Sequence, residues 1–151
     1  MDRLSVEQRS WNMSRIRGTN TQPEIQVRKA LHRMGYRFRL HRRNLPGKPD
    51  IVLPKYRTVL FVHGCYWHRH QHCRLAYKPK SHTAFWMTKL NENVQRDREV
   101  ASALREQGWH VGVIWECQTK DTEAMTERLR EEMKLAEIVR SKDSDCRRRQ
   151  A

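Results

Sequence analysis

Residues 50–63 read DIVLPKYRTVLFVH, and this stretch decides the fold. It holds two short apolar runs, at residues 50–53 and 58–63, separated by the turn-forming residues 54–57. Short apolar runs between turn signals are typical of buried β-strands. The stretch therefore predicts two neighbouring strands joined by a hairpin connection, with the second strand in the centre of a sheet.

Further strands are predicted on either side of this hairpin. Tyr36, Phe38 and Leu40 alternate with arginines, which is the period-2 pattern of a strand with one solvated face, and a turn follows at residues 45–47. The apolar run at residues 110–115 predicts the last strand of the core, with Trp115 buried. Together these runs predict one central sheet.

Three helices are predicted around the strands. The first begins at Thr21, whose hydroxyl caps it while Glu24 reaches back, and it ends near Gly35. The second covers residues 84–107, and the third begins at Asp121 and carries an apolar stripe. The chain is therefore predicted to form a single α/β domain in which helices flank a mixed sheet.

The charge of the chain points to a polyanionic partner. Lysine and arginine number 31 against 17 acidic residues, which gives a formal net charge of +14. Such a charge favours nucleic acid as the partner class. No apolar run approaches the roughly 20 residues that span a bilayer, and the N-terminus lacks the apolar stretch of a signal peptide, so we expect a cytoplasmic protein with no membrane partner.

The two ends of the chain differ in composition from the middle. Residues 1–20 form a basic segment, with a short helix expected over residues 5–16, which we expect to become ordered on a partner such as DNA. Residues 21–139 contain the predicted domain. Residues 140–151 have no apolar face to bury, so we expect a disordered basic tail.

The segment after the second strand has the composition of a metal site. In a reducing compartment, cysteines crowded by histidines are more often metal ligands than disulfide partners. His70 and Cys73 form a closely spaced pair, with Cys65 upstream and Cys117 after the last strand. These four residues predict a tetrahedral Cys3His zinc site that links the segment to the sheet.

Other assignments of the cysteines and histidines stay open. His72, which directly precedes Cys73, stays open as an alternative zinc ligand. Cys146 is the rival fourth sulfur, but it lies among the charges of the tail, so we expect it to be free. Buried thiols and surface histidines without a metal are the simplest alternative.

Asp50 and His68 are the candidate catalytic pair. Asp50 opens a strand, where a carboxylate can hold a hard cation such as magnesium against a phosphate. If the strands at 50–53 and 58–63 are neighbours, Asp50 and His68 lie at the same sheet edge. Histidine titrates near neutrality and can take a proton from water. A single aspartate at such a place is otherwise a turn residue, so the assignment depends on the pairing.

Two acidic residues face inward on the predicted helices. Asp97 lies on the same apolar stripe as Leu90 and Val94, and Glu24 lies on the same face as Leu31. An inward acid needs a partner. Both residues are therefore candidates for the site, with a structural salt bridge as the alternative for Asp97 and helix capping as the alternative for Glu24.

Several motifs resemble those of the very short patch repair (Vsr) DNA mismatch endonucleases, relatives of the restriction-endonuclease fold. The motifs are, in order, RSWNMSRIRGTNT, LPGKPDIVLPKYR, FVHGCYWHRHQHC, FWMTK with NVQRD, and GWHVGVIWEC. The resemblance implies a restriction-endonuclease-like domain with a structural zinc site. The usual Glu-x-Lys of that fold's second strand is replaced by Phe61, Val62 and His63, so a main-chain carbonyl at Val62 is the implied magnesium ligand.

The resemblance also implies roles for the site residues. Asp50 binds magnesium, and His68 is the general base, oriented by Asp97. His63 acts near the scissile phosphate, and Glu24 supports the site. The implied zinc ligands are Cys65, His70, Cys73 and Cys117. The implied DNA contacts are Tyr66, Trp67 and Trp86 as a wedge in the duplex, with Lys89 and Asn93 at the mispair.

The implied activity is nicking of one strand beside T·G mismatches, which arise when 5-methylcytosine is deaminated. The reaction is magnesium-dependent hydrolysis of a phosphodiester bond. The partner is duplex DNA carrying the mismatch, bound by a monomer at the bacterial nucleoid. A DNA polymerase, a ligase and mismatch-repair proteins act in the same repair.

Two other functions fit parts of the sequence. A restriction-type or nickase relative that acts on unmodified sequence shares the metal site but does not depend on a mispair. A non-catalytic zinc DNA-binding module explains the charge and the cysteines, but it does not explain the inward Asp97 or the pairing of Asp50 with His68. Nicking of matched and T·G duplexes separates the three.

Overall fold

A four-stranded mixed sheet forms the centre of the fold. The computed structural model describes residues 20–149, apart from the side chains of residues 139, 140 and 143–147. The strands are β1 (Arg39–Leu40), β2 (Ile51–Leu53), β3 (Thr58–His63) and β4 (His110–Trp115), in the order β1-β2-β3-β4. The predicted α/β class with a mixed sheet is confirmed, and the helix expected over residues 5–16 lies outside the described residues.

The hairpin predicted from residues 50–63 is present. β2 and β3 pair antiparallel, with Ile51 opposite Leu60 and Leu53 opposite Thr58. A single 3-10 turn, η1 (Pro54–Tyr56), connects them, and Arg57 closes it in the left-handed region at φ 49°. The first predicted strand is shorter than expected, because β1 lies at the edge and its only partner, β2, is three residues long.

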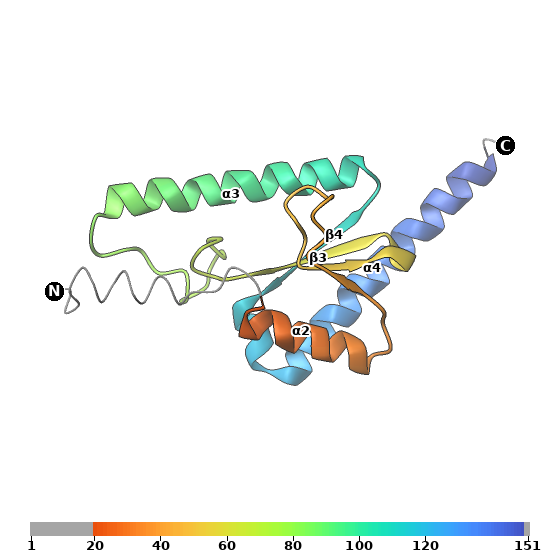
Figure 1. Ribbon diagram of the computed structural model, residues 1–151, viewed down its shortest axis with the longest axis horizontal. Coiled ribbons are helices and arrows are strands. Elements are labelled where there is room, and N and C mark those ends of the chain that lie inside the picture. Colours follow the sequence, from red (N-terminus) through yellow and green to blue (C-terminus); the bar gives the residue numbers. More distant parts are fainter. Residues whose placement is uncertain (1–19, 150–151) are drawn as a thin grey trace.

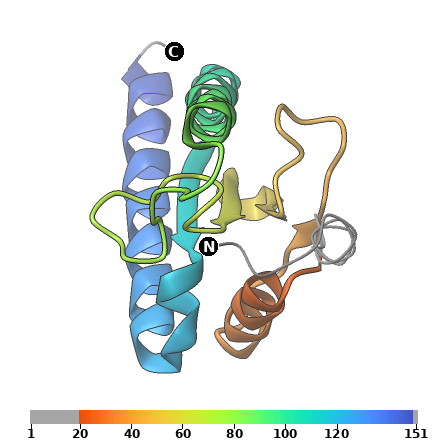
Figure 2. The same ribbon diagram turned by 90° about the vertical axis from the view of Figure 1, so that its left-hand side faces the viewer.

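The helices cover both faces of the sheet. They are α2 (Gln22–Arg33), α3 (Thr83–Glu106) and α4 (Thr122–Arg149). α2 and α4 lie on one side of the strands and α3 on the other (Figure 1). Figure 2 shows α3, in green, along its axis and well apart from α2, in orange-red. Among the described residues, no helix is long and apolar enough to cross a membrane.

Side-chain alternation along the strands divides the core in two. Leu60 of β3 packs toward α2 and α4, whereas Val59 and Phe61 pack toward α3. The first cluster is completed by Val27, Ala30, Leu31, Ile51, Leu53, Ile114, Met125, Leu129 and Met133. The second contains Leu45, Val52, Leu104 and Trp109. The sheet is therefore buried on both faces, as its apolar strands predict.

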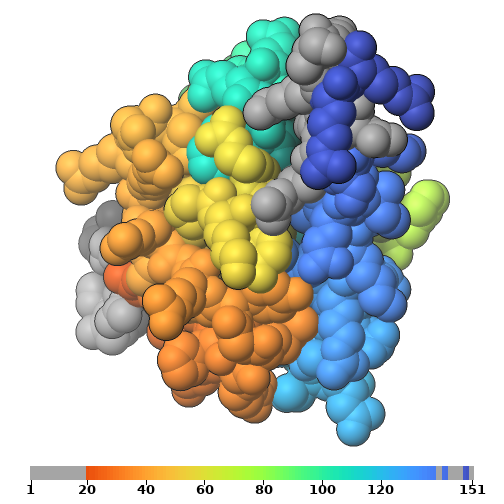
Figure 3. All heavy atoms as spheres, turned by 90° about the vertical axis from the view of Figure 1, so that its right-hand side faces the viewer, coloured from red at the N-terminus to blue at the C-terminus, as the bar shows by residue number. Residues whose placement is uncertain are grey.

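Helix α4 continues past the predicted end of the domain. Residues 140–149 are helical, although the sequence predicted a disordered tail from residue 140. The reason is local, because the helix from residue 122 contains neither glycine nor proline and is rich in the good helix formers glutamate, lysine and arginine. Near its middle, α4 contacts η1, and Figure 3 shows this yellow region beside the blue helix.

A buried polar cluster joins α4 to β4. Glu132 of α4 is 6% exposed, and its Oε2 lies 3.0 Å from His110 Nε2. Arg128, one helical turn away, forms an ion pair with the same carboxylate. A side chain at Gly112 would bring its Cβ to 2.7 Å from Glu132 Oε2, so β4 needs glycine there. The cluster closes this side of the sheet without leaving the acid unpaired.

The direction of β3 and β4 decides where the functional residues gather. These strands are parallel, and His63 lies opposite Trp115 at their carboxyl ends. The segments that follow both strands therefore leave the sheet at the same edge. Asp50, just before β2, lies at this edge as well, because β2 runs antiparallel to β3.

Candidate active site and metal centre

A cleft of about 970 Å³ opens at this sheet edge, between α2 and α3. The sequence-predicted residues that line it are Glu24, Asp50, Val62, His63, Trp67, His68, Asn93 and Asp97. They come from α2 and α3, from β3, from the residue just before β2 and from the segment after β3. One hollow therefore contains every residue that the sequence analysis assigned to the reaction.

His68 and Asp97 form the shortest polar contact between elements of the cleft. His68 Nδ1 lies 2.7 Å from Asp97 Oδ2, and both side chains are about one third exposed. If the neutral imidazole donates its Nδ1–H to this carboxylate, its lone pair is on Nε2. Asp97, the inward acid of α3, thus has the polar partner that was expected from its position on the apolar stripe.

His63 lies against His68 but is deeper. The two rings stack with centroids 3.9 Å apart and planes 7° apart. Burial, reinforced by the neighbouring His68 and opposed by the charge of Asp97, lowers the pKa of His63 to about 4. His63 is therefore neutral at pH 7, so its ring does not repel a positive charge on His68.

Asp50 is half-buried and is fixed by the next strand. Its Oδ2 accepts a hydrogen bond from Val62 N–H at 2.8 Å. Burial, opposed by this hydrogen bond and reinforced by the charge of Glu24, raises the pKa of Asp50 to about 6. Such a carboxylate is poised for a cation, because a nearby positive charge reverses both effects.

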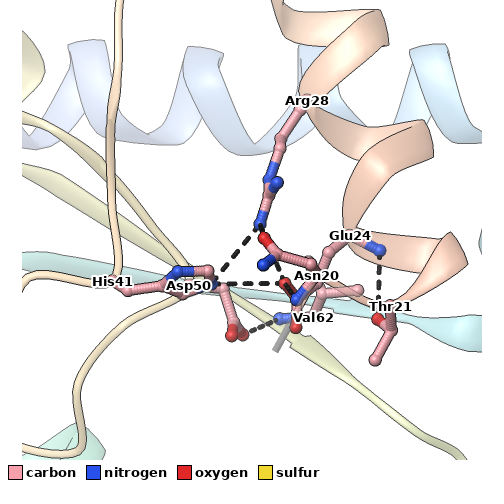
Figure 4. A network of polar contacts seen from close by, with 7 residues as sticks. All are labelled: Asn20, Thr21, Glu24, Arg28, His41, Asp50 and Val62. Atoms are coloured by element: carbon pink, nitrogen blue, oxygen red, sulfur yellow. Dashed lines mark hydrogen bonds and ion pairs between the residues drawn. The ribbon is translucent and has the colours of Figure 1, made fainter. Parts of the chain in front are cut away.

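Glu24 is held by three donors at a single oxygen. Its Oε2 accepts from Asn20 N–H at 2.9 Å and from Arg28 Nη2 at 3.0 Å, and it lies 3.3 Å from His41 Nε2 (Figure 4). The predicted cap at Thr21 is present, since its hydroxyl accepts from Glu24 N–H at 3.4 Å. The Glu24 carboxylate, however, reaches back one residue further than the predicted capping box, to Asn20.

His41 is the cleft residue that sequence reasoning missed. Ligand atoms of Glu24, His41 and Asp50 all lie within 4.8 Å of one another. The same is true of His63, His68 and Asp97, which form a separate group in the cleft. The only signal for His41 was a single histidine following the alternating residues 36–40, and this pattern is too common to identify a site.

The four predicted zinc ligands come together beyond the cleft. Ligand atoms of Cys65, His70, Cys73 and Cys117 lie within 4.8 Å of one another. His70 Nδ1 is 3.6 Å from Cys65 Sγ and 3.4 Å from Cys117 Sγ. Three sulfurs and one imidazole nitrogen are the donor set of a structural zinc site, so these residues fit that ion. The cluster joins the segment after β3 to the residue after β4.

One of the two competing ligands, His72, does not belong to this group. His72 is exposed and lies outside it, in the left-handed region at φ 57°. The side chain of Cys146 lies outside the described residues. Burial raises the pKa of the Cys65 thiol to about 12, and a bound zinc ion is the kind of charge that overcomes this cost.

Trp115 connects the two centres and is not the core residue that its apolar neighbours predicted. It is half-buried. Its ring stacks on His70 with centroids 4.2 Å apart and meets His63 edge-on at 5.4 Å. The reason is its place at the last position of β4, where the sheet ends and the metal-binding segment begins.

An aromatic surface lies beside the cleft, which one of its rings, Trp67, lines. Trp67 meets Tyr66 edge-on at 5.0 Å and Trp86 at 6.4 Å. Two further rings, Tyr77 and Phe85, are 62% and 57% exposed, and sequence reasoning assigned them no role. Phe85 stood beside Trp86 in the FWMTK motif, which is the signal that could have identified it.

The two polar residues predicted at the mispair lie on α3 beside these rings. Asn93 Nδ2 donates to the carbonyl of Trp67 at 3.1 Å, and so fixes the backbone that carries this ring. Lys89 is exposed, with its Nζ 5.8 Å from the centre of the Phe85 ring. Both residues border the aromatic surface, and their contacts with DNA stay predictions.

Comparison with known proteins agrees with this arrangement. Residues 1–75 match the family model described as DNA mismatch endonuclease Vsr. The chain is 51% identical to type II nicking enzyme V.XorIIP of Xanthomonas oryzae over 129 residues, which cover 85% of this chain and 94% of the relative. It is 44% identical to DNA mismatch endonuclease Vsr of Escherichia coli, over 82% of this chain and 81% of the relative.

A further relative extends the likeness to another organism. Type II nicking enzyme V.NmeAIP of Neisseria meningitidis is 42% identical over 85% of this chain and 91% of its own length. The chain belongs to the family of the DNA mismatch endonuclease Vsr.

Proposed function

We propose that this protein is an endonuclease that nicks one strand of duplex DNA beside T·G mismatches arising from deamination of 5-methylcytosine. The observation that carries the proposal is the His68–Asp97 pair, at 2.7 Å, in the same cleft as Asp50 and Glu24. Family membership supports the class of reaction, and it implies that the sheet is of the restriction-endonuclease type.

Two metals are part of the proposal. The carboxylates of Asp50 and Glu24 are the hard oxygen donors that magnesium prefers, and the Val62 carbonyl is the proposed main-chain ligand. When bound, magnesium supplies stabilisation of negative charge on the phosphate and on the leaving oxygen. The proposed zinc ion is structural, since all four protein positions of its site are filled by Cys65, His70, Cys73 and Cys117.

The proposed proton transfer follows from the histidine geometry. His68 accepts a proton from the attacking water at Nε2, because its Nδ1 faces Asp97. Asp97 then stabilises the imidazolium and keeps the ring in place. His63 stays neutral beside this charge, since burial holds its pKa near 4, and can hydrogen-bond to the scissile phosphate without repelling His68.

Recognition in this proposal uses charge and stacking. The net charge of +14 attracts the phosphate backbone irrespective of sequence. Tyr66, Trp67 and Trp86 are proposed to enter the duplex, at the lowest cost where pairing is already imperfect. Lys89 and Asn93 are proposed to contact the mispair. A polymerase, a ligase and mismatch-repair proteins would complete the repair at the nucleoid in the cytoplasm, with this protein acting as a monomer.

A second candidate function has its own support. Two of the relatives named above carry the words "type II nicking enzyme", which describe cutting without reference to a mismatch. A nickase that acts on unmodified sequence would use the same cleft. It differs from the proposed function only in what it recognises.

The test is a nicking assay on two duplexes that differ at one base pair, T·G or T·A, with a different fluorophore on each strand. We expect magnesium-dependent cutting of the T-containing strand of the T·G duplex, and none in EDTA. Equal cutting of both duplexes would support the second candidate. Binding without cutting of either would leave a non-catalytic zinc module and contradict both.

A further inference from the structure

His41 lines the cleft, and neither the sequence pattern nor the proposed proton transfer gives it a role. It follows β1 directly, and its backbone is in the left-handed region at φ 45°. A residue other than glycine in this region is uncommon and is held there by its surroundings. Here the backbone N–H of His41 donates to the Asp50 carbonyl at 3.3 Å. This bond holds the backbone of His41 beside the residue that precedes β2.

The imidazole points at the two carboxylates. Its Nε2 is 3.3 Å from Glu24 Oε2, and ligand atoms of His41, Glu24 and Asp50 lie within 4.8 Å of one another. Ligands at about 2.1 Å from an octahedral ion lie about 3 Å apart. Figure 4 shows the three residues approaching one space from α2, from the segment after β1 and from the start of β2.

We propose that His41 is a protein ligand of the same divalent cation that Asp50 and Glu24 hold. The inference rests on the proposed function, because the cation is the one that the reaction would use. A nitrogen ligand changes the selectivity of the site, since imidazole favours transition metals whereas carboxylates suit magnesium. The site should therefore bind Mn²⁺ more tightly, relative to Mg²⁺, than oxygen ligands alone would.

A purely orienting role for His41 is the alternative to be separated. The Glu24 oxygen next to His41 also accepts from Arg28, whose Nη2 is 3.4 Å from His41 Nε2. On the far side of the sheet, His110 contacts Glu132 in a similar way, with no second carboxylate grouped beside it among the described residues. If His41 only orients Glu24, any side chain with a hydrogen-bond donor should replace it.

The test measures Mn²⁺ binding to the zinc-loaded protein without DNA, by electron paramagnetic resonance. His41→Gln keeps an N–H donor for Glu24 and removes the imidazole nitrogen, whereas His41→Ala removes both. We expect the wild type to show imidazole ¹⁴N modulation of the Mn²⁺ echo. Both variants should lose it, with Mn²⁺ affinity lower by about 10- to 100-fold. Mg²⁺ affinity, measured by competition, should fall less.

His110→Gln is the matched control, because it changes the equivalent histidine beside the other buried glutamate and should leave Mn²⁺ binding unchanged. Retention of the modulation and the affinity in His41→Gln, with loss only in His41→Ala, would overturn the proposal in favour of an orienting role. So would a modulation that disappears on replacing His68 instead. A protein that nicks T·G duplexes without this modulation contradicts only the His41 inference. A protein with the modulation but no nicking contradicts only the proposed function.

Discussion

Two buried glutamates in this chain have the same kinds of neighbour and different surroundings. Glu24 on α2 has Arg28 one turn away and His41 from another element. Glu132 on α4 has Arg128 one turn away and His110 from β4. Both side chains are more than nine tenths buried. The local pattern of a glutamate, an arginine four positions away and a distant histidine therefore does not separate them.

What separates the two is the space beside each carboxylate. Glu24 lines the cleft and is grouped with a second carboxylate, that of Asp50. The two negative charges together favour a bound cation. Glu132 lies so close to Gly112 that a Cβ at this glycine would be 2.7 Å from its Oε2, and no second carboxylate is grouped with it among the described residues. Burial raises the pKa of Glu132, but the hydrogen bonds from His110 and Arg128 outweigh it and lower the pKa overall. The charge of Glu132 is thus balanced by its protein neighbours, whereas Glu24 and Asp50 together leave negative charge that a bound cation could balance.

The largest effect expected on the cleft side is that of Asp50→Ala. It should abolish nicking of a T·G duplex while leaving thermal unfolding and duplex binding nearly unchanged, because it removes a metal ligand and little core packing. Asp121→Ala is the control, since Asp121 caps α4 through the N–H groups of Glu123 and Ala124 and lines no cleft. Full activity of Asp50→Ala would remove this residue from the site.

Replacement of the proposed base comes next. His68→Ala should reduce the single-turnover nicking rate by about two to four orders of magnitude, the usual range for a positioned general base. The exposed His32 on α2 is the control, and His32→Ala should keep the wild-type rate. A loss of less than tenfold for His68→Ala would assign the base to another residue.

The proposed zinc site should contribute to the stability of the fold, so loss of one of its ligands should destabilise the protein. Cys117→Ser should release the metal and lower the melting temperature, because this ligand ties the segment after β3 to the residue after β4. Cys146→Ser should change neither zinc content nor stability. Native protein without zinc in elemental analysis, or zinc lost with Cys146, would contradict the Cys3His assignment.

A smaller effect is expected at the aromatic surface. Trp67→Ala should weaken binding to the T·G duplex by about 1 to 3 kcal/mol, the range for a base stacked on an aromatic ring, and narrow the preference for T·G over T·A. Arg148→Ala should at most weaken both duplexes alike, because phosphate contacts carry no base information. A large fall in melting temperature with unchanged discrimination would show that Trp67 only packs the fold.

The sequence predicted those features that depend on neighbours along the chain. The hairpin of residues 50–63, the Thr21 and Asp121 caps and the long helix α3 all follow from local apolar and capping patterns. The register of β2 against β3 then explains why Asp50 lies near the end of β3. In contrast, the prediction of disorder from residue 140 was wrong, because residues 140–149 are helical. Low apolar content does not prevent a helix that is built from good helix formers.

The features that sequence did not predict depend on contacts across space. His41 belongs to the Glu24 cluster only because the segment after β1 turns back in a left-handed conformation. Trp115 was expected in the core, and it lies between two histidines because the sheet ends there. The sequence analysis placed Asp50 and His68 as one pair. The structure divides the cleft into two groups, with His63, His68 and Asp97 in one and Glu24, His41 and Asp50 in the other.

The comparison of the two glutamates is tested most directly by the nicking rates of Glu24→Gln and Glu132→Gln on the T·G duplex, at a temperature where both are folded. Both variants should lose stability, by about 1 to 3 kcal/mol, because each leaves a buried hydrogen-bond partner unsatisfied. Only Glu24→Gln should lose activity, by about 10- to 100-fold, because it removes one of the two carboxylates that are proposed to hold the cation. Glu132→Gln should cut at the wild-type rate. Equal losses of rate in the two variants, or an unchanged rate in Glu24→Gln, would contradict the assignment of the cleft as the catalytic centre.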